Sequence, residues 1–557
     1  MRNNYYIIVI TFFIIFFAIG VCIFKDYGVG WDEGNNHHYG YLVLNYILGD
    51  KQGAEQFVDP LISDRNKRFI YYLPRDNTSG FWDPVTGQFA KTHGPVFEVL
   101  LVSIEKFLNL RDSQKIYFLR HIAIFMMFYI GAVFFYKLCR YAFDDWKIGI
   151  LGSLFLVLSP RIFSHSFHNS VDISFLSMFI VSMYTLIRFL EKKNILWASI
   201  HAIACAITVD IRIAGIMIPF ITFVLVIFDI IASNFKKVDI KKIVWILIIY
   251  SIIFITLSTL LWPMLWGNPF RNFIAAFKAS ATDPWDWWEL YFGNKTYGQK
   301  VPWHFTPVWL FITTPPIYTV FFFIGLLSLI KSIWGIKKFY PRIKVQLIAI
   351  FCFFGPLIAV ALFKTTLFNG WRHMFFIYPG FLLISLTGFL TIDSFIKKSL
   401  QGLRYKIING LFIFIIFCSL AFTVSFMIRS HPYQNVYFNW AIGGLKNAKG
   451  QFDIGYWGVE LREAFEYILK NDKNKIINYR VDNPNWTPVV LANASILPEG
   501  YRLNFITEES YVNEPLKHRV DYLVTNYYNY SIEHEFEEIW SRKVDGVKIV
   551  TVYKLTD

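Results

Sequence analysis

Charged side chains are scarce in this sequence of 557 residues, and their scarcity excludes an ordinary soluble protein. Asp, Glu, Lys and Arg together supply 17% of the residues, whereas soluble domains carry about a quarter. Hydrophobic residues supply 55% and aromatic residues 19%. They gather into repeated apolar runs of about 20 residues, each followed by Lys or Arg, which is the pattern of a multi-pass membrane protein.

Cysteine is also rare. Five cysteines are present, and none falls in a segment that we predict on the outer side of the membrane, so no disulfide bonds are expected. No Cys/His spacing typical of a zinc site occurs, and no internal repeat is visible. Sequons of the N-x-S/T type are present, for example at Asn294 and Asn493.

The net charge of +14 does not indicate a nucleic-acid-binding protein, because of where the charges lie. Residues 1–428 hold 39 of the 54 Lys and Arg residues but only 23 of the 40 Asp and Glu residues. The excess falls in short loops between apolar runs, as the positive-inside rule predicts for cytoplasmic loops. These basic loops are 137–147, 188–194, 234–242, 331–344 and 397–406.

With these loops in the cytoplasm, the sequence predicts an α-helical polytopic protein of the inner (plasma) membrane with about eleven spans. The N-terminus then lies inside and the C-terminal region outside. The first run is too long for a signal-peptide core and is kept as a span. The predicted spans are 6–24, 117–136, 148–166, 172–190, 195–211, 213–232, 243–263, 307–330, 345–363, 373–392 and 408–427.

The first external loop is then predicted over 25–116. Its later part, 93–110, carries Glu98, Glu105 and Lys106 in an otherwise apolar stretch. This composition favours an amphipathic helix that lies in the membrane interface instead of crossing the bilayer.

Beyond the membrane domain of residues 1–428, the sequence changes in character. Residues 429–557 are nearly charge-balanced and lack long apolar runs. Their patterns predict a small extracytoplasmic α/β domain, which we interpret as an acceptor-docking or structural domain because it has no phosphate-binding glycine loop or nucleophile elbow. The predicted elements are a helix at 458–471, strands at 475–481 and 521–528, and a hairpin at 543–555 that turns at Asp545-Gly546.

The stretch "GWDEGNNHHYGYLVLNY" (30–46) places Asp32 and Glu33 next to the first span. The two acids either favour the free N–H groups at the start of a helix, or form a chemical site. Aromatic neighbours such as Trp31 and Tyr39 would partly desolvate a carboxylate there, and a raised pKa would suit it to act as a general base.

A second cluster lies at a predicted outer turn, in "SPRIFSHSFHNSVDISF" (159–175). Asp172 either caps the following span or serves a site, because an acid at the start of a span is otherwise costly. Arg161 either extends to the interface or joins the same site as His165 and His168.

Cations also occur on the outer side, where the positive-inside rule does not place them. Each has a structural reading, and Asp210 and Arg212 in particular could neutralise each other. Together the cations would clamp an anionic headgroup, since Arg matches phosphate oxygens bidentately. They are Lys91 near His93, Arg212, Lys364, and Arg372 beside His373.

The external loop 264–306 is rich in aromatic residues. It contains "DPWDWWELYFG" (283–293), and "VPWHFTP" (301–307) follows with Trp303 and His304. Such a stretch either lies flat at the membrane interface or stacks against sugar rings and guides an acyl chain.

These motifs resemble those of integral-membrane glycosyltransferases of the GT-C type. The resemblance is to family 39, which includes protein O-mannosyltransferases and aminoarabinose transferases, and here to its bacterial members. It rests on "WDEG" after the first span and on "THGPVFEVL", "SPRIFSHSFHNSVDISF", "TVDIRIAGIMIPF", "WRHMFFIYPG", "HPYQNVYFN" and "FDIGYWGVELREA". Arg212 replaces the Lys that is more usual at the basic turn, and Gly94 replaces one Pro.

The resemblance implies a GT-C fold and the inverting transfer of a sugar from a polyprenyl-phosphate donor to an acceptor hydroxyl. Asp32 is predicted as the base, Glu33 as an orienting or acceptor-binding group, and Asp172 as a contact to a sugar or a metal ion. The donor phosphate is predicted to bind Lys91, Arg161, Arg212, Lys364 and Arg372. The substrate is predicted to contact His93, His168, Trp303, His304 and His373.

The implied partners are the lipid-linked sugar, membrane lipid, and a glycan, lipid or protein acceptor. A divalent cation, Mg²⁺ or Mn²⁺, stays open, with Asp32, Asp172 and His168 as ligands. A transporter or flippase of lipid-linked saccharides is an alternative, as is a ligase that moves a whole oligosaccharide. Uncharged span centres and polar groups gathered at one face favour surface chemistry over transport.

Overall fold

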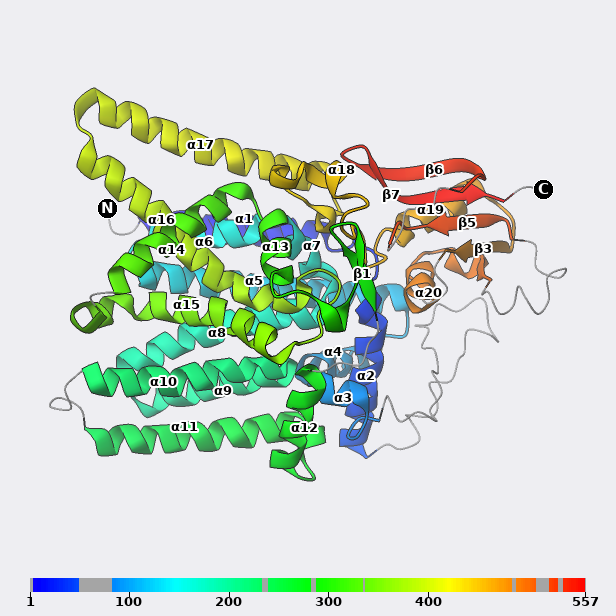
Figure 1. Ribbon diagram of the computed structural model, residues 1–557. Helices are drawn as coiled ribbons and strands as arrows, with labels where there is room; N and C mark the ends of the chain where they lie inside the picture. The colour runs from blue at the N-terminus through cyan, green and yellow to red at the C-terminus, as the bar shows by residue number, and fades with distance from the viewer. Residues whose placement is uncertain are drawn as a thin grey trace.

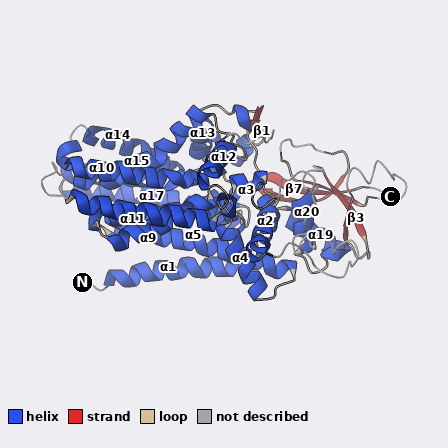
Figure 2. Ribbon diagram, turned by 90° about the horizontal axis from the view of Figure 1, so that it is seen from below, coloured by secondary structure: helices blue, strands red, loops and turns tan. Residues whose placement is uncertain are grey.

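The protein forms a long bundle of helices with a strand-containing region at one end, as the computed structural model shows (Figure 1). The structure describes residues 4–49, 83–232, 239–281, 287–333, 336–482, 487–506, 520–528 and 534–555. In the view of Figure 2 the strands gather at the end of the bundle that lies opposite the N-terminus.

The membrane bundle agrees with the predicted spans. Among the described residues, eight helical segments are long and apolar enough to cross a membrane: Tyr5–Ile23, Ser113–Phe143, Ser170–Lys192, Ile213–Ile231, Ile240–Leu261, Lys344–Phe363, Arg372–Ser399 and Gly402–Arg429. The predicted span 148–166 is a pair of helices, α6 (Trp146–Val157) and α7 (Pro160–His168), bent by 69° at Pro160. Two predicted spans match shorter apolar helices, Ile195–Ile211 and Pro316–Lys331. The chain is therefore a multi-pass membrane protein.

The helices of the bundle follow one another in chain order. Their bounds are α1 (Asn4–Ile23), α5 (Ser113–Phe143), α8 (Ser170–Lys192), α9 (Ile195–Ile211), α10 (Met217–Ala232), α11 (Ile240–Leu261), α14 (Pro316–Ile333), α15 (Ile336–Phe363), α16 (Tyr378–Ser399) and α17 (Gly402–Arg429). The end of α10, the start of α11 and the turn from α16 to α17 lie at the end of the bundle away from the strands (Figure 1). The predicted basic loop 397–406 contains the turn from α16 to α17.

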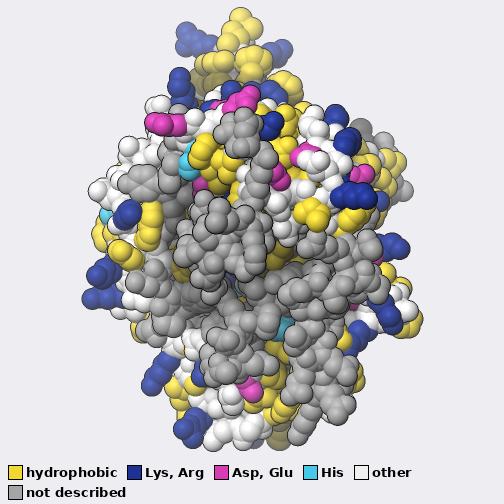
Figure 3. All heavy atoms as spheres, turned by 90° about the vertical axis from the view of Figure 1, so that its right-hand side faces the viewer, with side chains coloured by type: hydrophobic (Ala, Val, Ile, Leu, Met, Phe, Trp, Pro, Cys, Tyr) yellow, Lys and Arg dark blue, Asp and Glu magenta, His cyan; other side chains and the backbone are white. Residues whose placement is uncertain are grey.

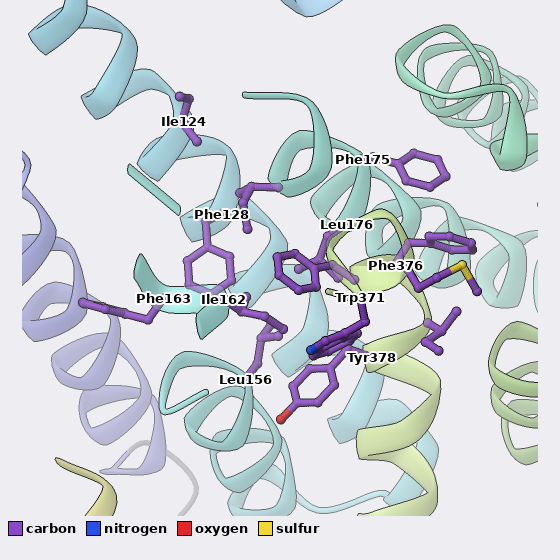
Figure 4. Close-up of a cluster of buried hydrophobic side chains, with 14 of the residues drawn as sticks. Ile124, Phe128, Leu156, Ile162, Phe163, Phe175, Leu176, Trp371, Phe376 and Tyr378 are labelled. Carbon is purple, nitrogen blue, oxygen red and sulfur yellow. The ribbon is translucent and has the colours of Figure 1, made fainter. Parts of the chain in front are cut away.

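Aromatic and aliphatic side chains fill the middle of the bundle. Figure 4 shows Phe128 of α5, Ile162 of α7, Leu176 of α8 and Tyr378 of α16 converging there. Small residues let α14 and α16 approach closely: a Cβ on Gly388 would lie 1.8 Å from the Phe321 carbonyl oxygen. This close backbone packing is typical of helix pairs in membranes.

Several shorter elements cover the end of the bundle next to the strands. They are α2 (Trp31–Leu48), α3 (Gln88–Thr92), α4 (Val96–Phe107), the 3₁₀ turn η2 (Ile213–Ile216), η3 (Pro263–Leu265), α12 (Pro269–Ala281), the hairpin β1 (Trp288–Tyr291) and β2 (Asn294–Tyr297), η4 (Gly298–Lys300), α13 (Phe305–Ile312) and η5 (Arg372–Ile377). Of these elements, α2, α3, η2, α12 and η5 line the candidate site.

Helix α4 is the segment that we predicted as an amphipathic helix in the interface. Its acidic side chains do not face the interface but form buried ion pairs within the protein. Glu98 and Glu105 are buried and both pair with the guanidinium of Arg120, which is 0% exposed. Glu105 also bonds His37 of α2 at 2.5 Å. The acids of α4 thus face inward and fix this helix to α2 and α5.

The C-terminal region begins after Arg429 and contains a mixed sheet of five strands in the order β4-β3-β5-β7-β6. Its elements are η6 (Gln434–Val436), η7 (Trp440–Ile442), α18 (Gly444–Ala448), α19 (Leu461–Asn471), β3 (Ile477–Val481), α20 (Thr487–Ser495), η9 (Gly500–Arg502), β4 (Leu503–Phe505), β5 (Tyr522–Thr525), β6 (Glu537–Val544) and β7 (Val547–Lys554). Strand β3 runs parallel to β4 and β5, and β6 and β7 form the predicted hairpin with Asp545 and Gly546 at positive φ. Viewed from this end, the described surface carries both acidic and basic side chains (Figure 3).

Candidate active site

A cavity of about 290 Å³ lies where the bundle meets the C-terminal region. One wall is polar and includes Asp32 of α2, Arg212, and Arg372 of η5. Another part of the wall is apolar and is built by α10, α12 and α15, with side chains that include Met217, Phe277, Val360 and Phe363. A cavity with these two walls can hold a molecule that has a charged head and an apolar tail.

Four charged groups of alternating sign meet at the polar wall. The Arg372 guanidinium donates from Nη1 to Asp32 Oδ2 at 2.7 Å and to Asp172 Oδ2 at 3.2 Å. The other oxygen of Asp172 pairs with Arg212 Nη2 at 2.5 Å. The side chains of Asp172 and Arg372 are 1% and 5% exposed, whereas that of Asp32 is 28% exposed. Of the two carboxylates, Asp32 and Asp172, Asp32 is therefore the one that faces the cavity.

The Asp-Glu pair at the start of α2 divides into two roles. Glu33 Oε1 accepts a hydrogen bond from the Gly30 backbone N–H at 2.7 Å, and Glu33 Oε2 lies 3.2 Å from His121 Nε2. Glu33 is buried and is not among the residues that line the cavity. Glu33 stabilises the first turn of α2, as the reading of the pair as a helix start expects, whereas Asp32 lines the cavity.

Asp172 is held at the start of α8 by its neighbour Asn169. The Asn169 side chain accepts from the Asp172 backbone N–H at 3.0 Å and donates to Asp172 Oδ2 at 2.9 Å. Asn169, and not Asp172, therefore supplies the helix cap. This leaves the Asp172 carboxylate to pair with the two guanidinium groups.

The suggested pairing of Asp210 with Arg212 is wrong. Asp210 Oδ2 accepts from the backbone N–H of Val96 at 2.8 Å, at the start of α4. A Cβ on Gly94 would lie 1.6 Å from the Asp210 carbonyl oxygen, so only glycine fits at this close contact. Arg212 is thereby free to pair with Asp172.

Two of the predicted substrate-binding histidines, His93 and His373, also line the cavity. The His93 ring stacks on Phe89 with centroids 4.5 Å apart, and the His373 ring contacts Phe368 at 4.7 Å. Burial, together with the positive charge of Arg212 and Arg372, lowers the pKa of His93 to about 3. His93 is therefore neutral at physiological pH and can donate or accept a hydrogen bond.

The other predicted site residues do not line this cavity. The Arg161 guanidinium is buried 5.2 Å from the Trp309 ring and 4.8 Å from the Phe438 ring. Lys364 is exposed, and Lys91 is partly buried on α3. Three residues remain. His168 packs against Trp457, and Trp303 is 76% exposed. His304 bonds the Tyr291 hydroxyl at 2.6 Å.

Other residues of the cavity were not singled out from the sequence. Tyr456 and Tyr528 come from the C-terminal region, and the Tyr456 hydroxyl lies 3.3 Å from His165 Nε2. Trp287 comes from the aromatic external loop, and its ring contacts Trp31 at 6.1 Å. Trp287 had a signal in the sequence through its place among clustered aromatic residues, and Tyr456 through its place in the motif "FDIGYWGVELREA".

The residues suggested for a divalent cation do not fit a metal site. In the described part of the chain, no group of three or more His, Cys, Asp or Glu side chains is arranged to hold a metal ion. The Arg372 guanidinium bonds both Asp32 and Asp172, and His168 packs against Trp457 instead. No step of the reaction proposed below runs through a metal ion.

The lowered pKa of His93 gives a test of its surroundings. The folded chain binds this proton only near pH 3, whereas an unfolded chain binds it near pH 6.5. Stability should therefore fall as the pH drops below about 6.5, by about 2 kcal/mol at pH 5 from this group. His93→Gln should remove this part of the loss, measured as the thermal unfolding midpoint in detergent at pH 7.5 and 5. Equal pH dependence of the two proteins would contradict the neutral state of His93 in the folded chain.

Comparisons with known proteins show only a distant similarity. No protein-family model matches the sequence, and no curated protein matches it. The apo oligosaccharyltransferase of Archaeoglobus fulgidus is 12% identical with a TM-score of 0.49, over 94% of this chain and 70% of that chain. Apo ArnT from Cupriavidus metallidurans is 10% identical with a TM-score of 0.45, over 97% of both chains. ArnT bound to undecaprenyl phosphate is 10% identical with a TM-score of 0.43, again over 97% of both chains. At these values the similarity assigns neither a substrate nor a site residue to this chain.

Proposed function

We propose that this protein is a GT-C-type glycosyltransferase of the inner (plasma) membrane, which moves a sugar from a polyprenyl-phosphate donor to an acceptor hydroxyl group. The observation that carries the proposal is the cavity with two unlike walls. Asp32, Arg212 and Arg372 meet at one wall, and apolar residues of α10, α12 and α15 form the other. The site would lie at the extracytoplasmic face, because the basic loops at the other end of the bundle favour the cytoplasm.

Asp32 is the base in this reaction. It takes the proton of the acceptor hydroxyl as that oxygen forms a bond to the anomeric carbon of the sugar. The bond between the anomeric carbon and the phosphate oxygen breaks, and polyprenyl phosphate leaves with one further negative charge. Attack opposite the phosphate inverts the anomeric centre.

Arg372 and Arg212 stabilise the charge that grows on the departing phosphate. Preorganised cations in a site with little water usually supply the largest part of such a rate enhancement. Asp172 bonds both guanidinium groups and holds them at the cavity. Its own carboxylate is 1% exposed, so we assign it a positioning role and no contact with the sugar.

The cavity also provides for the lipid and the acceptor. Phe277 and Phe363 line the apolar wall and are 40% and 57% exposed, so a prenyl chain can reach the cavity from the bilayer. Their rings touch at 6.1 Å. The acceptor would approach past Tyr528 and Pro488 of the C-terminal region, while Trp31 and Trp287 offer ring faces to a sugar.

The test is consumption of a defined donor by the purified protein. The protein in detergent and lipid is incubated with a panel of undecaprenyl-phosphate hexoses, pentoses and amino sugars and with membrane-extracted acceptors, with and without EDTA. Release of undecaprenyl phosphate together with a glycosylated acceptor would support the proposal and name the sugar. If no donor is consumed, the glycosyltransferase assignment fails, and transport of a lipid-linked saccharide becomes the function to test.

A further inference from the structure

The C-terminal region inserts a buried tryptophan, Trp457, next to the polar wall of the cavity. Its side chain is among the largest that are fully buried. The Arg372 guanidinium carbon lies 5.0 Å from the centre of the Trp457 ring and 5.3 Å from that of Phe368. An electron-rich ring face attracts a guanidinium group, and more strongly where water is excluded. Trp457 thus contacts the cation that joins the two carboxylates.

The same indole ring contacts the segments that lead to both carboxylates. Gly30 precedes α2 and hence Asp32, and a Cβ on Gly30 would lie 2.7 Å from Trp457 Cε3. His168 ends α7, just before α8 and Asp172, and its ring centroid lies 5.4 Å from that of Trp457. Trp457 therefore lies at the junction of the three elements that carry Asp32, Asp172 and Arg372.

A second residue of the C-terminal region fixes the backbone beside this junction. The Asn493 side chain accepts from the Val29 backbone N–H and donates to the Val29 carbonyl, both at 2.9 Å. Asn493 is 0% exposed, so in the folded chain its sequon is inaccessible to a glycosylating enzyme. These bonds tie the segment before α2 to the C-terminal region.

The Arg372 guanidinium needs such support because its hydrogen bonds alone do not fix it. Its Nη1 group makes the bonds to both Asp32 and Asp172. Its buried Nε–H has no hydrogen-bond partner among the described residues. A planar group bonded through one nitrogen can still rotate about it, and a ring stacked on its face opposes that rotation.

We propose that Trp457 is a positioning residue of the active site, which holds the plane of the Arg372 guanidinium between Asp32 and Asp172. This inference rests on the proposed function, because it assigns Trp457 a task in the sugar transfer. It makes the C-terminal region a working part of the catalytic centre, beyond acceptor docking. The aromatic face of the residue, more than its volume, is the property required.

The experiment compares Trp457→Phe with Trp457→Leu in the donor assay described above. Phenylalanine keeps a ring face, and leucine does not. We expect Trp457→Phe to keep kcat within about threefold of the wild type, and Trp457→Leu to lose about 30-fold or more in kcat with the KM for the donor changed less. Equal kcat for the wild type and Trp457→Leu would overturn the inference.

Trp309 supplies the matched control. The centre of its ring lies 5.2 Å from the Arg161 guanidinium carbon. Trp309 is as fully buried as Trp457, and neither Trp309 nor Arg161 lines the cavity. Trp309→Phe and Trp309→Leu should lower the unfolding midpoint without the 30-fold difference in kcat. A loss in Trp309→Leu as large as that in Trp457→Leu would show a merely structural effect and overturn the inference.

The Trp457 variants could fail to fold, and the wild type could fail to consume any donor; each case has its own reading. If both Trp457 variants fail to fold, Gly30→Ala tests the same contact from the other side, because its Cβ would press on the indole ring. A reduced kcat with an unchanged donor KM would support the inference, and an unchanged kcat would overturn it. If the wild type consumes no donor, the proposed function itself fails, and the role of Trp457 in it fails for that separate reason.

Discussion

Replacing Asp32 with Asn should lower the turnover of the lipid-linked donor by about 10²–10⁴-fold, the range expected for the loss of a general base. Asp32 is the carboxylate of the charged cluster with access to the cavity, since its side chain is 28% exposed and that of Asp172 is 1% exposed. Asn keeps the shape and an oxygen that can accept from Arg372 Nη1. The change therefore removes proton uptake while leaving the geometry of the cluster in place.

Glu33→Gln is the neighbouring contrast for this variant. Glu33 bonds the Gly30 backbone and His121 and does not line the cavity, so its substitution should cost stability more than turnover. The two variants are compared by kcat with the donor identified for the wild type and by the thermal unfolding midpoint. An Asp32→Asn protein with normal turnover would remove Asp32 from the mechanism as a base.

The spans were predictable because hydropathy is a property of each segment by itself. A membrane span needs about 20 apolar residues wherever it packs. Eight of the predicted segments match helices that are long and apolar enough to cross a membrane, a ninth matches the bent pair, and the other two match the shorter apolar helices Ile195–Ile211 and Pro316–Lys331. The bend between α6 and α7 was not predicted, although Pro160 marks its position. In the C-terminal region the Asp545-Gly546 turn was likewise local and correct.

The partners of charged residues were not predictable in the same way. Arg372 and Asp32 are separated by 340 positions in the chain, and no local pattern encodes their contact. Arg161 and Arg372 looked alike in the sequence, as outer-side cations near aromatic residues. They differ in the structure because the rings of Trp309 and Phe438 hold Arg161 away from the cavity, whereas Arg372 meets two carboxylates.

The contribution of the C-terminal region was hidden for a related reason. The motif "FDIGYWGVELREA" around Trp457 carried a family resemblance but no role for any of its residues, and Asn493 stood out only as a sequon. Their partners, Arg372 and Val29, belong to distant elements of the membrane domain. A residue whose role is to hold another residue in place can be recognised only when both positions are known.

Replacing Arg372 with Gln should affect both stability and turnover, and the two effects can be separated. Removing one partner of a buried ion pair leaves the other unpaired, at a cost of about 3–5 kcal/mol. Asp172 keeps Arg212 as a partner, so the cost here should lie at the low end of that range. Turnover should fall by about 10²–10³-fold, because a cation that stabilises the departing phosphate is lost.

The double variant Arg372→Gln/Asp172→Asn distinguishes the two effects. Arg372 lies between Asp32 and Asp172, so in the single variant these two carboxylates repel each other. Removing the Asp172 charge relieves this repulsion, so the unfolding midpoint should recover in part while turnover stays low. Recovery of turnover together with stability would show that Arg372 serves only to neutralise Asp172.

Arg161→Gln is the control variant. It decides between the phosphate-binding role that the sequence predicted for Arg161 and the enclosed position that Arg161 has in the structure. A phosphate-binding Arg161 would cost donor turnover when replaced, whereas an arginine enclosed by Trp309 and Phe438 should cost stability and leave the donor KM and kcat unchanged.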